Sequence, residues 1–485
     1  MRNLIFSLSM IWVLFDTQIK AQDLRVMRIY EEGLSQSGYI LIDNQSKEAI
    51  VIDPRKDVQE FIDTLNAYDA TLKFVTETHI HADYLSGARE LAKMTASTLA
   101  LSQEGPAEWQ YKFDYLPLKQ GKMLAFGEYF LQVLHTPGHT PESISFLLHF
   151  NTDMINPIKA FTGDFLFVGN VGRPDLLEKY EEGDANSTAS AKALYQSIEK
   201  FRALPDDLEI WPGHGAGSFC GKTLSNIPFS TLKAEKLTNP ALQYSGKEAE
   251  FIKYILADQV VPPPYFKLMK EWNRDGTSCK LVDDRYAEID ASEITNLIGK
   301  GVKVIDTRVR KEVGKGFLPN TIHIELNKGF NNWFAQLVNH KDQVVFIVEK
   351  GNEKSLAHKL MRVGFDNVLG VGNDISSANL KSIKYIKAED LPKAVKKKGI
   401  HAWDIRTAKE YAEGHIAGIA NLPLHEIKEK ASKLDKNQPI IIHCQSGARA
   451  AIGYSLFESL GFTDVTVYDG GINEWKKLGN KLVSE

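Results

Sequence analysis

The strongest constraint on the fold is an internal repeat in the second half of the chain. Four short patterns of the first copy recur in the same order in the second copy. The matched pairs are Val302–Arg308 with His401–Arg406, Gly316–Ile322 with Gly414–Ala420, Val344–Gly351 with Ile440–Gly447, and Gly364–Val368 with Gly461–Val465. Because apolar strand-like runs alternate with helical stretches in each copy, each predicts an α/β domain with a parallel sheet. We assign these domains to residues 284–375 and 383–485.

The first half of the chain contains many short β-branched or aromatic runs, which are typical of strands. The clearest are Lys73–Thr78, Phe130–Leu134, Ile144–Leu148 and Leu208–Trp211. The run Pro262–Pro264 can neither continue a helix nor pair inside a sheet. We therefore expect a first domain over residues 23–257 and a linker over residues 258–283. The Lys-rich stretch Lys381–Lys398 is expected to join the two repeats as a solvated linker and helix.

The N-terminus has the pattern of a secretory signal peptide over residues 1–21. Arg2 supplies a positive charge, Leu4–Phe15 is apolar but short for a membrane span, and Ala21 fits a cleavage site. This predicts an exported or periplasmic mature chain without a membrane span. The alternative is an amphipathic or buried N-terminal segment of a cytoplasmic protein.

Charge and cysteine content exclude two classes of protein. Lys+Arg 58 against Asp+Glu 62 gives a formal net charge of −4, which argues against nucleic acid as the main ligand. Three cysteines cannot form a disulfide framework.

Four loops that directly follow predicted strands carry histidine or aspartate. The loops are Thr78–Tyr84, Thr136–Thr140, Thr162–Asp164 and Pro212–Gly215. Their candidate ligands are His79, His81, Asp83, His139, Asp164 and His214. A single His is usually structural or exposed, but side chains at strand ends converge at one edge of a sheet. The ordered set therefore predicts a metal site.

This ordered set resembles the metallo-β-lactamase superfamily, whose signature is His-x-His-x-Asp-His followed by a His, an Asp and a His. The resemblance covers nearly all of residues 25–255 and implies an αββα sandwich. One position departs from it, because Tyr84 stands where the last His of the first motif is expected. In two-metal members that His helps to hold the second metal, and a phenol replaces it poorly at neutral pH. The departure favours a single metal over a dinuclear zinc hydrolase.

The surrounding residues are similar to the persulfide dioxygenase branch of the superfamily. The similar segments are Thr78–Asp83, Thr162–Phe167 and Gly172–Asp175. The resemblance implies that His79, His139 and Asp164 hold one iron(II) per chain, with zinc as the alternative. Two His and one carboxylate leave open positions for oxygen and a substrate sulfur.

Five further residues are expected around the metal. The resemblance implies that His81 and Asp83 orient ligands or substrate, and Tyr84 belongs to the same outer set. His214 is either a remnant ligand of the second metal site or a hydrogen-bonding group of the pocket. Arg173 either contacts an anionic thiol carrier or forms a structural pair with Asp175.

A second candidate site lies in the second repeat, where the strand Ile440–Cys444 leads into a loop and a helix expected near Ala450. The residues of the loop that would cradle a persulfide are Gln445, Ser446, Gly447 and Ala448. Loop N–H groups and the helix N-terminus favour a thiolate and anionic sulfur groups, and Arg449 adds a fixed charge. The alternative is a buried, inert Cys after a strand.

The second repeat resembles the rhodanese family. The matching segments are Asp404–Arg406, Glu410–Tyr411, Gly414–Gly418, Cys444–Arg449 and Tyr468–Gly471. The six-residue loop fits sulfurtransferases rather than the longer-looped phosphatase relatives. The resemblance implies that Cys444 is a nucleophile that carries a persulfide, with Arg449, Asp404 and Arg406 in the catalytic set.

The first repeat departs at the decisive positions. Val348 stands at the position of Cys444, and Glu353 at that of Arg449. Without the thiol and the cation it cannot carry sulfane sulfur in the same way, so we expect a non-catalytic rhodanese-like domain that shapes a cleft or a dimer. Cys220 and Cys279 match no motif, and a structural role is expected.

Together these resemblances imply a persulfide dioxygenase–rhodanese fusion. The expected substrates are a low-molecular-weight persulfide such as glutathione persulfide, O2, sulfite and thiosulfate. The alternatives are a zinc-dependent thioester hydrolase of the glyoxalase II type, and a sulfur-binding or sensing protein with degenerate domains. The sequence leaves open the thiol carrier, the direction of sulfur transfer and whether the chain forms a homo-oligomer.

Overall fold

The computed structural model describes residues 23–150, 155–174, 184–222, 224–257, 262–263, 265–277 and 286–484. The expected signal peptide, Asp175 and Cys279 lie outside the described residues. The chain divides into two compact units, Met1–Leu281 with Leu360–Gly364, and Val282–Lys359 with Phe365–Glu485. In the part of the chain that the structure describes, no helix is long and apolar enough to cross a membrane.

The first unit is built on two six-stranded sheets. In spatial order, the first sheet contains β1 (Leu24–Glu31), β2 (Gln36–Asp43), β3 (Glu48–Ile52), β4 (Thr71–Thr76), β5 (Thr98–Ser102) and β6 (Leu116–Leu118). The second contains β12 (Ser230–Thr231), β11 (Glu209–Pro212), β10 (Lys159–Gly163), β9 (Ile144–Phe150), β8 (Tyr129–His135) and β7 (Met123–Phe126). The four strands expected from the sequence correspond to β4, β8, β9 and β11, with small shifts at their ends.

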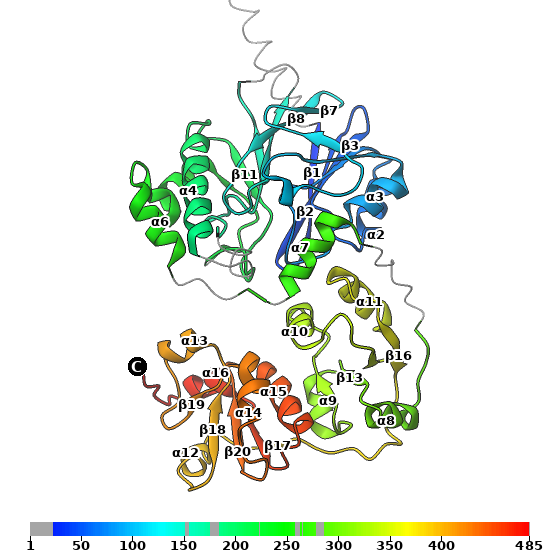
Figure 1. The fold of residues 1–485 in the computed structure, drawn as a ribbon, viewed down its shortest axis with the longest axis vertical. Helices are drawn as coiled ribbons and strands as arrows, with labels where there is room; N and C mark the ends of the chain where they lie inside the picture. Colours follow the sequence, from blue (N-terminus) through cyan, green and yellow to red (C-terminus); the bar gives the residue numbers. More distant parts are fainter. Residues whose placement is uncertain are drawn as a thin grey trace, which may run out of the picture. The chain divides into compact units, whose positions relative to one another are not determined.

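The two sheets face each other across a shared apolar core, and helices cover their outer faces (Figure 1). Leu41 and Ile52 of the first sheet belong to the same buried cluster as Leu131 and Phe146 of the second. Helices α2 (Gln59–Ala67) and α3 (Ala88–Thr95) pack on the first sheet, and α4 (Asp184–Phe201) and α6 (Glu248–Leu256) on the second. A short α5 (Leu232–Thr238) follows β12. This arrangement confirms the predicted αββα sandwich.

Helix α7 (Tyr265–Asp275) corrects the expected linker over residues 258–283. A proline cannot sit inside a helix, but it is tolerated at a helix start, so the proline run precedes α7 without excluding it. Tyr265 and Phe266 are buried, and Asn273 donates to the carbonyls of His81 and Tyr84, both at 2.8 Å. Much of the expected linker is therefore part of the first unit, where it holds the first histidine loop.

The second unit contains the two repeats, each with a parallel sheet. The first sheet has the order β14 (Ile322–His323), β13 (Lys303–Asp306), β15 (Val344–Ile347) and β16 (Val368–Gly372). The second has the order β17 (Lys384–Tyr385), β21 (Val465–Tyr468), β20 (Ile440–His443), β18 (His401–Asp404) and β19 (Ala420–Asn421). Strand β17 lies in the stretch expected as a solvated linker, and it pairs with β21 as an edge strand.

Each repeat surrounds its sheet with short helices. Those of the first repeat are α8 (Ala291–Gly299), α9 (Arg310–Lys315), α10 (Phe330–Leu337) and α11 (Glu353–Arg362). Those of the second are α12 (Leu391–Ala394), α13 (Ala408–Glu413), α14 (Ile427–Ala431), α15 (Ala448–Ser459) and α16 (Gly471–Lys477). Because parallel strands require a crossover between neighbours, this alternation of strands and helices follows from the repeat pattern. The two α/β domains predicted from the sequence are therefore present.

Candidate active sites

Three of the expected metal ligands converge in the first unit. His79 follows β4, His139 follows β8 and Asp164 follows β10, and all three are buried. The Oδ2 atom of Asp164 lies 3.8 Å from Nε2 of His79 and 3.6 Å from Nε2 of His139. One potential ligand atom from each residue lies within 4.8 Å of the others. The same Oδ2 atom is buried and has no hydrogen-bond partner among the described residues, which fits an atom that faces a cation.

The remaining polar atom of each side chain is taken up by another group. Nδ1 of His79 lies 3.0 Å from Oγ1 of Thr78, and Nδ1 of His139 lies 2.9 Å from the carbonyl oxygen of Arg173. Oδ1 of Asp164 lies 2.7 Å from Nδ1 of His214. These contacts fix the side-chain orientations and direct the two Nε2 atoms and Oδ2 toward one another, as second partners do in metal sites.

The electrostatics of this cluster also fit a bound cation. Burial lowers the pKa of His79 and of His139, which keeps both imidazoles neutral, the form that binds metal. Burial opposes ionisation of Asp164, but the charge of His214 and its hydrogen bond to Oδ1 outweigh it and hold the pKa of that carboxyl well below its usual range. A neutral imidazole pair with an ionised carboxylate is a suitable ligand set for iron(II) or zinc.

The second candidate site lies between β20 and α15 in the second unit. Cys444 is buried directly after β20, and α15 begins four residues later at Ala448. Gly447 adopts φ 88°, a conformation that favours glycine, and its N–H donates to Sγ of Cys444 at 3.1 Å. The thiol therefore lies at the N-terminus of a helix with a backbone donor directed at it, as the sequence predicted.

Ion pairs organise the residues around Cys444. Arg449 donates to both carboxylate oxygens of Glu410, at 2.7 Å each. Arg406 pairs with Asp404 in the same two-pronged manner and also donates to Oε1 of Gln445 at 3.2 Å. The expected catalytic residues Asp404 and Arg406 are thus engaged with each other, and Arg406 reaches the cradle loop through Gln445.

Comparison with known proteins places both sites in known families. The Metallo-beta-lactamase superfamily model matches residues 33–214, and the Rhodanese-like domain model matches residues 290–373 and 387–478. Human "Persulfide dioxygenase ETHE1, mitochondrial" is 30% identical over 235 residues, which cover 47% of this chain and 78% of that protein. The chain belongs to the metallo-β-lactamase superfamily. Its first domain is ETHE1-like, and a tandem of rhodanese-like domains follows.

Two further similar proteins of the superfamily carry names other than persulfide dioxygenase. "Hydroxyacylglutathione hydrolase GloC" of Haemophilus influenzae is 29% identical over 220 residues, covering 41% of this chain and 95% of that protein. A crystal structure described as a metallo-beta-lactamase from Staphylococcus aureus is 36% identical, with a TM-score of 0.66. The match covers 72% of this chain and 99% of that one, so the shared fold extends beyond the metallo-β-lactamase domain.

In the metallo-β-lactamase domain, the residues that would remain for a second metal, as in two-metal members of the superfamily, hydrogen-bond to one another. His214 lies between two carboxylates, with Nδ1 2.7 Å from Oδ1 of Asp164 and Nε2 2.8 Å from Oδ2 of Asp83. The hydroxyl of Tyr84 accepts from Nε2 of Gln36 at 3.2 Å, and burial raises the pKa of Tyr84 well above its usual range. Cys220 forms a second buried cluster with Asp83 and His214, a proximity that the sequence did not indicate.

Asp53 is a residue of this domain that the sequence analysis missed. It follows β3 at φ 52°, and its carboxylate accepts from N–H and Oγ1 of Thr78 at 2.7 and 2.9 Å. It also lies 3.1 Å from Nε2 of His81. Burial opposes protonation of His81, but Asp53 outweighs it and raises the pKa of His81 to about 9. His81 is therefore engaged with Asp53, and the strand-end criterion used for the four loops would also have selected Asp53.

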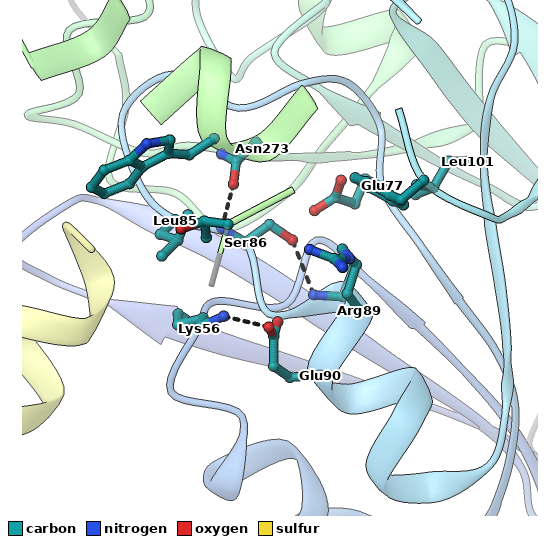
Figure 2. A pocket seen from close by; sticks show the side chains of 12 residues that line it. Lys56, Glu77, Leu85, Ser86, Arg89, Glu90, Leu101 and Asn273 are labelled. Atoms are coloured by element: carbon teal, nitrogen blue, oxygen red, sulfur yellow. Dashed lines mark hydrogen bonds and ion pairs between the residues drawn. The ribbon is translucent and has the colours of Figure 1, made fainter. Parts of the chain in front are cut away.

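Helix α7 supports the first histidine loop of the metallo-β-lactamase domain from its other side. Figure 2 shows Asn273 on this helix beside Ser86, with Lys56 and Glu90 paired below. Oδ1 of Asn273 accepts from the N–H of Ser86 at 2.9 Å, while its Nδ2 donates to the carbonyls of His81 and Tyr84. A single amide side chain thus satisfies three backbone groups of the loop, which keeps its conformation fixed.

The first rhodanese-like domain has the same loop geometry with different chemistry. Gly351 adopts φ 93°, close to the value for Gly447 in the second domain. Its N–H donates to Oε2 of Glu353 at 2.8 Å, and Nδ2 of Asn373 donates to Oε1 of the same carboxylate at 2.8 Å. Val348, at the position of the thiol, is buried. The side chain of Glu353 therefore uses the backbone donor that serves the thiol in the second domain.

Proposed function

We propose that the chain is an iron(II)-dependent persulfide dioxygenase whose product is processed by its own sulfurtransferase domain. The observation that carries the proposal is the cluster of His79, His139 and Asp164, in which three ligand atoms face one another and Oδ2 of Asp164 has no other partner in the described residues. The similarity to persulfide dioxygenase ETHE1 supports the choice of reaction.

In this proposal each side chain of the first site has a defined task. His79, His139 and Asp164 hold the iron and leave open positions for oxygen and a substrate sulfur. Bound iron would supply the redox chemistry that joins oxygen to sulfur. Thr78 and the carbonyl of Arg173 keep the two imidazoles oriented, while His214 secures the far oxygen of Asp164. The buried setting limits access of water to the reacting sulfur.

At the second site, Cys444 acts as the sulfur carrier. Its thiolate attacks the outer sulfur of a persulfide, the S–S bond breaks, and the thiol carrier leaves as its thiolate. Sulfite then attacks the terminal sulfur of the Cys444 persulfide, which forms thiosulfate and returns the Cys444 thiolate. The N–H of Gly447 stabilises the negative charge on Sγ in both steps.

A zinc-dependent thioester hydrolase is the second candidate, and the similarity to hydroxyacylglutathione hydrolase GloC favours it. Tyr84, whose buried hydroxyl accepts from Gln36 where two-metal members have an imidazole, weighs against a second metal ion, although Asp83, His214 and Cys220 form a second group of potential ligands. The two candidates differ in metal content and in the reaction catalysed, so one set of measurements separates them.

The test is metal analysis of the purified chain together with oxygen uptake on glutathione persulfide. We expect about one iron per chain and persulfide-dependent oxygen consumption. His139→Ala removes one of three ligands, so the metal affinity and the rate of oxygen uptake should both fall by more than about 100-fold. His135→Gln, which changes an imidazole outside the cluster, is the matched control. Two zinc ions per chain with thioester hydrolysis and no oxygen uptake would overturn the proposal.

A further inference from the structure

The first rhodanese-like domain places one cation directly on the cradle loop of the second. Arg310 is the first residue of α9, and its Nη1 donates to the carbonyl oxygen of Ser446 at 2.7 Å. The same nitrogen lies 3.5 Å from Oδ1 of Asp469. Ser446 lies between Cys444 and Gly447, so this contact reaches the backbone that carries the N–H donor for Sγ.

The fit between Arg310 and the loop is close. A Cβ atom added to Gly447 would lie 2.2 Å from Nη1 of Arg310 and 2.3 Å from Oδ1 of Asp469. The same Cβ atom would lie 2.4 Å from the backbone carbonyl oxygen of Asp469, so this backbone and the φ of 88° both require glycine at position 447. The loop, the arginine and the aspartate are packed together as one structure.

Backbone contacts hold the other side of the cradle. The N–H of Ile472 donates to the carbonyl of Cys444, and the N–H of Asn473 to that of Gln445, both at 3.0 Å. The carbonyl of Ser446 is satisfied by Arg310 instead. The cradle is therefore held on one side by its own domain and on the other by the neighbouring repeat.

The relative position of the two repeats within this unit is itself set by hydrogen bonds between them, one buried and one partly buried. The N–H of His323 donates to Oγ of Ser455 at 2.9 Å, and the N–H of Asn320 to Oε2 of Glu458 at 2.7 Å. Both acceptors lie on α15, the helix that begins at the cradle. Arg310 therefore approaches the loop from a framework that is anchored to the same helix.

We propose that Arg310 is a positioning residue for sulfur transfer at Cys444. In this proposal the first repeat, which lacks the thiol, supports the reaction of the second repeat. Arg310 holds the carbonyl of Ser446 and thereby keeps the N–H of Gly447 directed at Sγ. At the matching position of the second repeat the chain has Ala408, so the second repeat has no equivalent of the Arg310 side chain. The inference rests on the proposed sulfurtransferase function.

The experiment compares Arg310→Ala, Arg310→Lys and Lys311→Ala in the full chain, with thiosulfate as donor and cyanide as acceptor. Arg310→Ala should lower kcat about tenfold with little change in KM, because it removes a charge-assisted hydrogen bond that orients the loop without binding substrate. Arg310→Lys keeps a positive donor and should recover much of the lost rate. Lys311→Ala removes the neighbouring positive charge and should leave kcat near that of the wild type.

A second readout follows the thiol itself. Alkylation of Cys444 by iodoacetamide at fixed pH, measured on its peptide by mass spectrometry, should slow severalfold in Arg310→Ala and not in Lys311→Ala. A rise in KM alone would assign Arg310 to substrate binding and overturn the inference, as would equal kcat and alkylation rates in wild type and Arg310→Ala. A wild-type chain without sulfur transfer would refute the proposed function instead.

Discussion

The two rhodanese-like domains share one loop geometry and differ in what the loop binds. In the second domain, the N–H of Gly447 donates to Sγ of Cys444, and Arg449 is paired with Glu410 outside the loop. In the first, the N–H of Gly351 donates to the carboxylate of Glu353, a side chain of the same segment. The group that such a loop holds is thus the thiol of Cys444 in one copy and the carboxylate of Glu353 in the other.

This difference shows that the first repeat departs from the second in more than the missing thiol. A backbone donor at a helix start needs a partner, and an unsatisfied one costs about 1–3 kcal/mol. Glu353 provides the partner from within, so the loop keeps its shape without a ligand. The first repeat is then free to serve as a support, for which Arg310 is the most direct evidence.

The largest expected effect comes from removing the thiol of the second loop. Cys444→Ser should reduce thiosulfate sulfurtransferase activity at least about 10³-fold, because a hydroxyl cannot form the persulfide. Oxygen uptake with glutathione persulfide should stay within about twofold, since the His79, His139 and Asp164 cluster lies in the other unit.

The products of the same variant test the coupling of the two sites. With excess persulfide, the wild type should accumulate thiosulfate and Cys444→Ser should accumulate sulfite, as measured by derivatisation and chromatography. An unchanged ratio of sulfite to thiosulfate would show that the second loop does not act on the product of the first site.

A smaller effect is expected when a thiol is placed in the first loop. In a Cys444→Ser background, Val348→Cys should show no sulfur transfer, because Glu353 occupies the backbone donor. Adding Glu353→Gln removes the negative charge beside the new thiol, so its alkylation by iodoacetamide should become about tenfold faster than with Val348→Cys alone. Equal alkylation rates with and without Glu353 would contradict the idea that this carboxylate blocks the loop.

The sequence was sufficient for the fold class and for the core members of both candidate sites, although it missed Asp53. Strand-end histidines and the repeat pattern predicted the αββα sandwich, the parallel sheets, and the segments that carry His79, His139, Asp164 and Cys444. These features depend on local periodicity and on motifs within a few residues.

Contacts between distant segments could not be predicted in the same way. Asn273 supports a loop about 190 residues earlier in the chain, and Arg310 reaches a loop 136 residues later. Neither has a motif, because each acts through backbone carbonyls that any residue could provide. The proline run before α7 also reads as a boundary, although the apolar residues of α7 return the chain to the first unit.

The smallest expected effect concerns the ion pair beside the reactive loop. Burial opposes ionisation of Glu410, but the two hydrogen bonds from Arg449, joined by those from Thr407, outweigh it and lower the pKa of Glu410 to about 2. Since the folded-state pKa lies below the ordinary value of about 4.3, the pair stabilises the fold at higher pH. This contribution is complete above about pH 5 and is lost as the pH falls toward 2.

Glu410→Gln should therefore lower the free energy of unfolding of the second unit by about 1 kcal/mol at pH 7, a value that allows for partial exposure of the pair. Urea unfolding at a series of pH values should show this difference shrinking below about pH 4. Sulfur transfer should fall only about threefold, because Arg449 stays charged and near the loop.

The matched control is Glu312→Gln at the equivalent position of the first repeat, where the carboxylate pairs only with the exposed Lys315 among its described ion pairs. If both variants lose the same stability and their differences do not depend on pH, the Glu410–Arg449 pair is no more than an ordinary surface contact, and the contrast between the two loops does not extend to the residues around them.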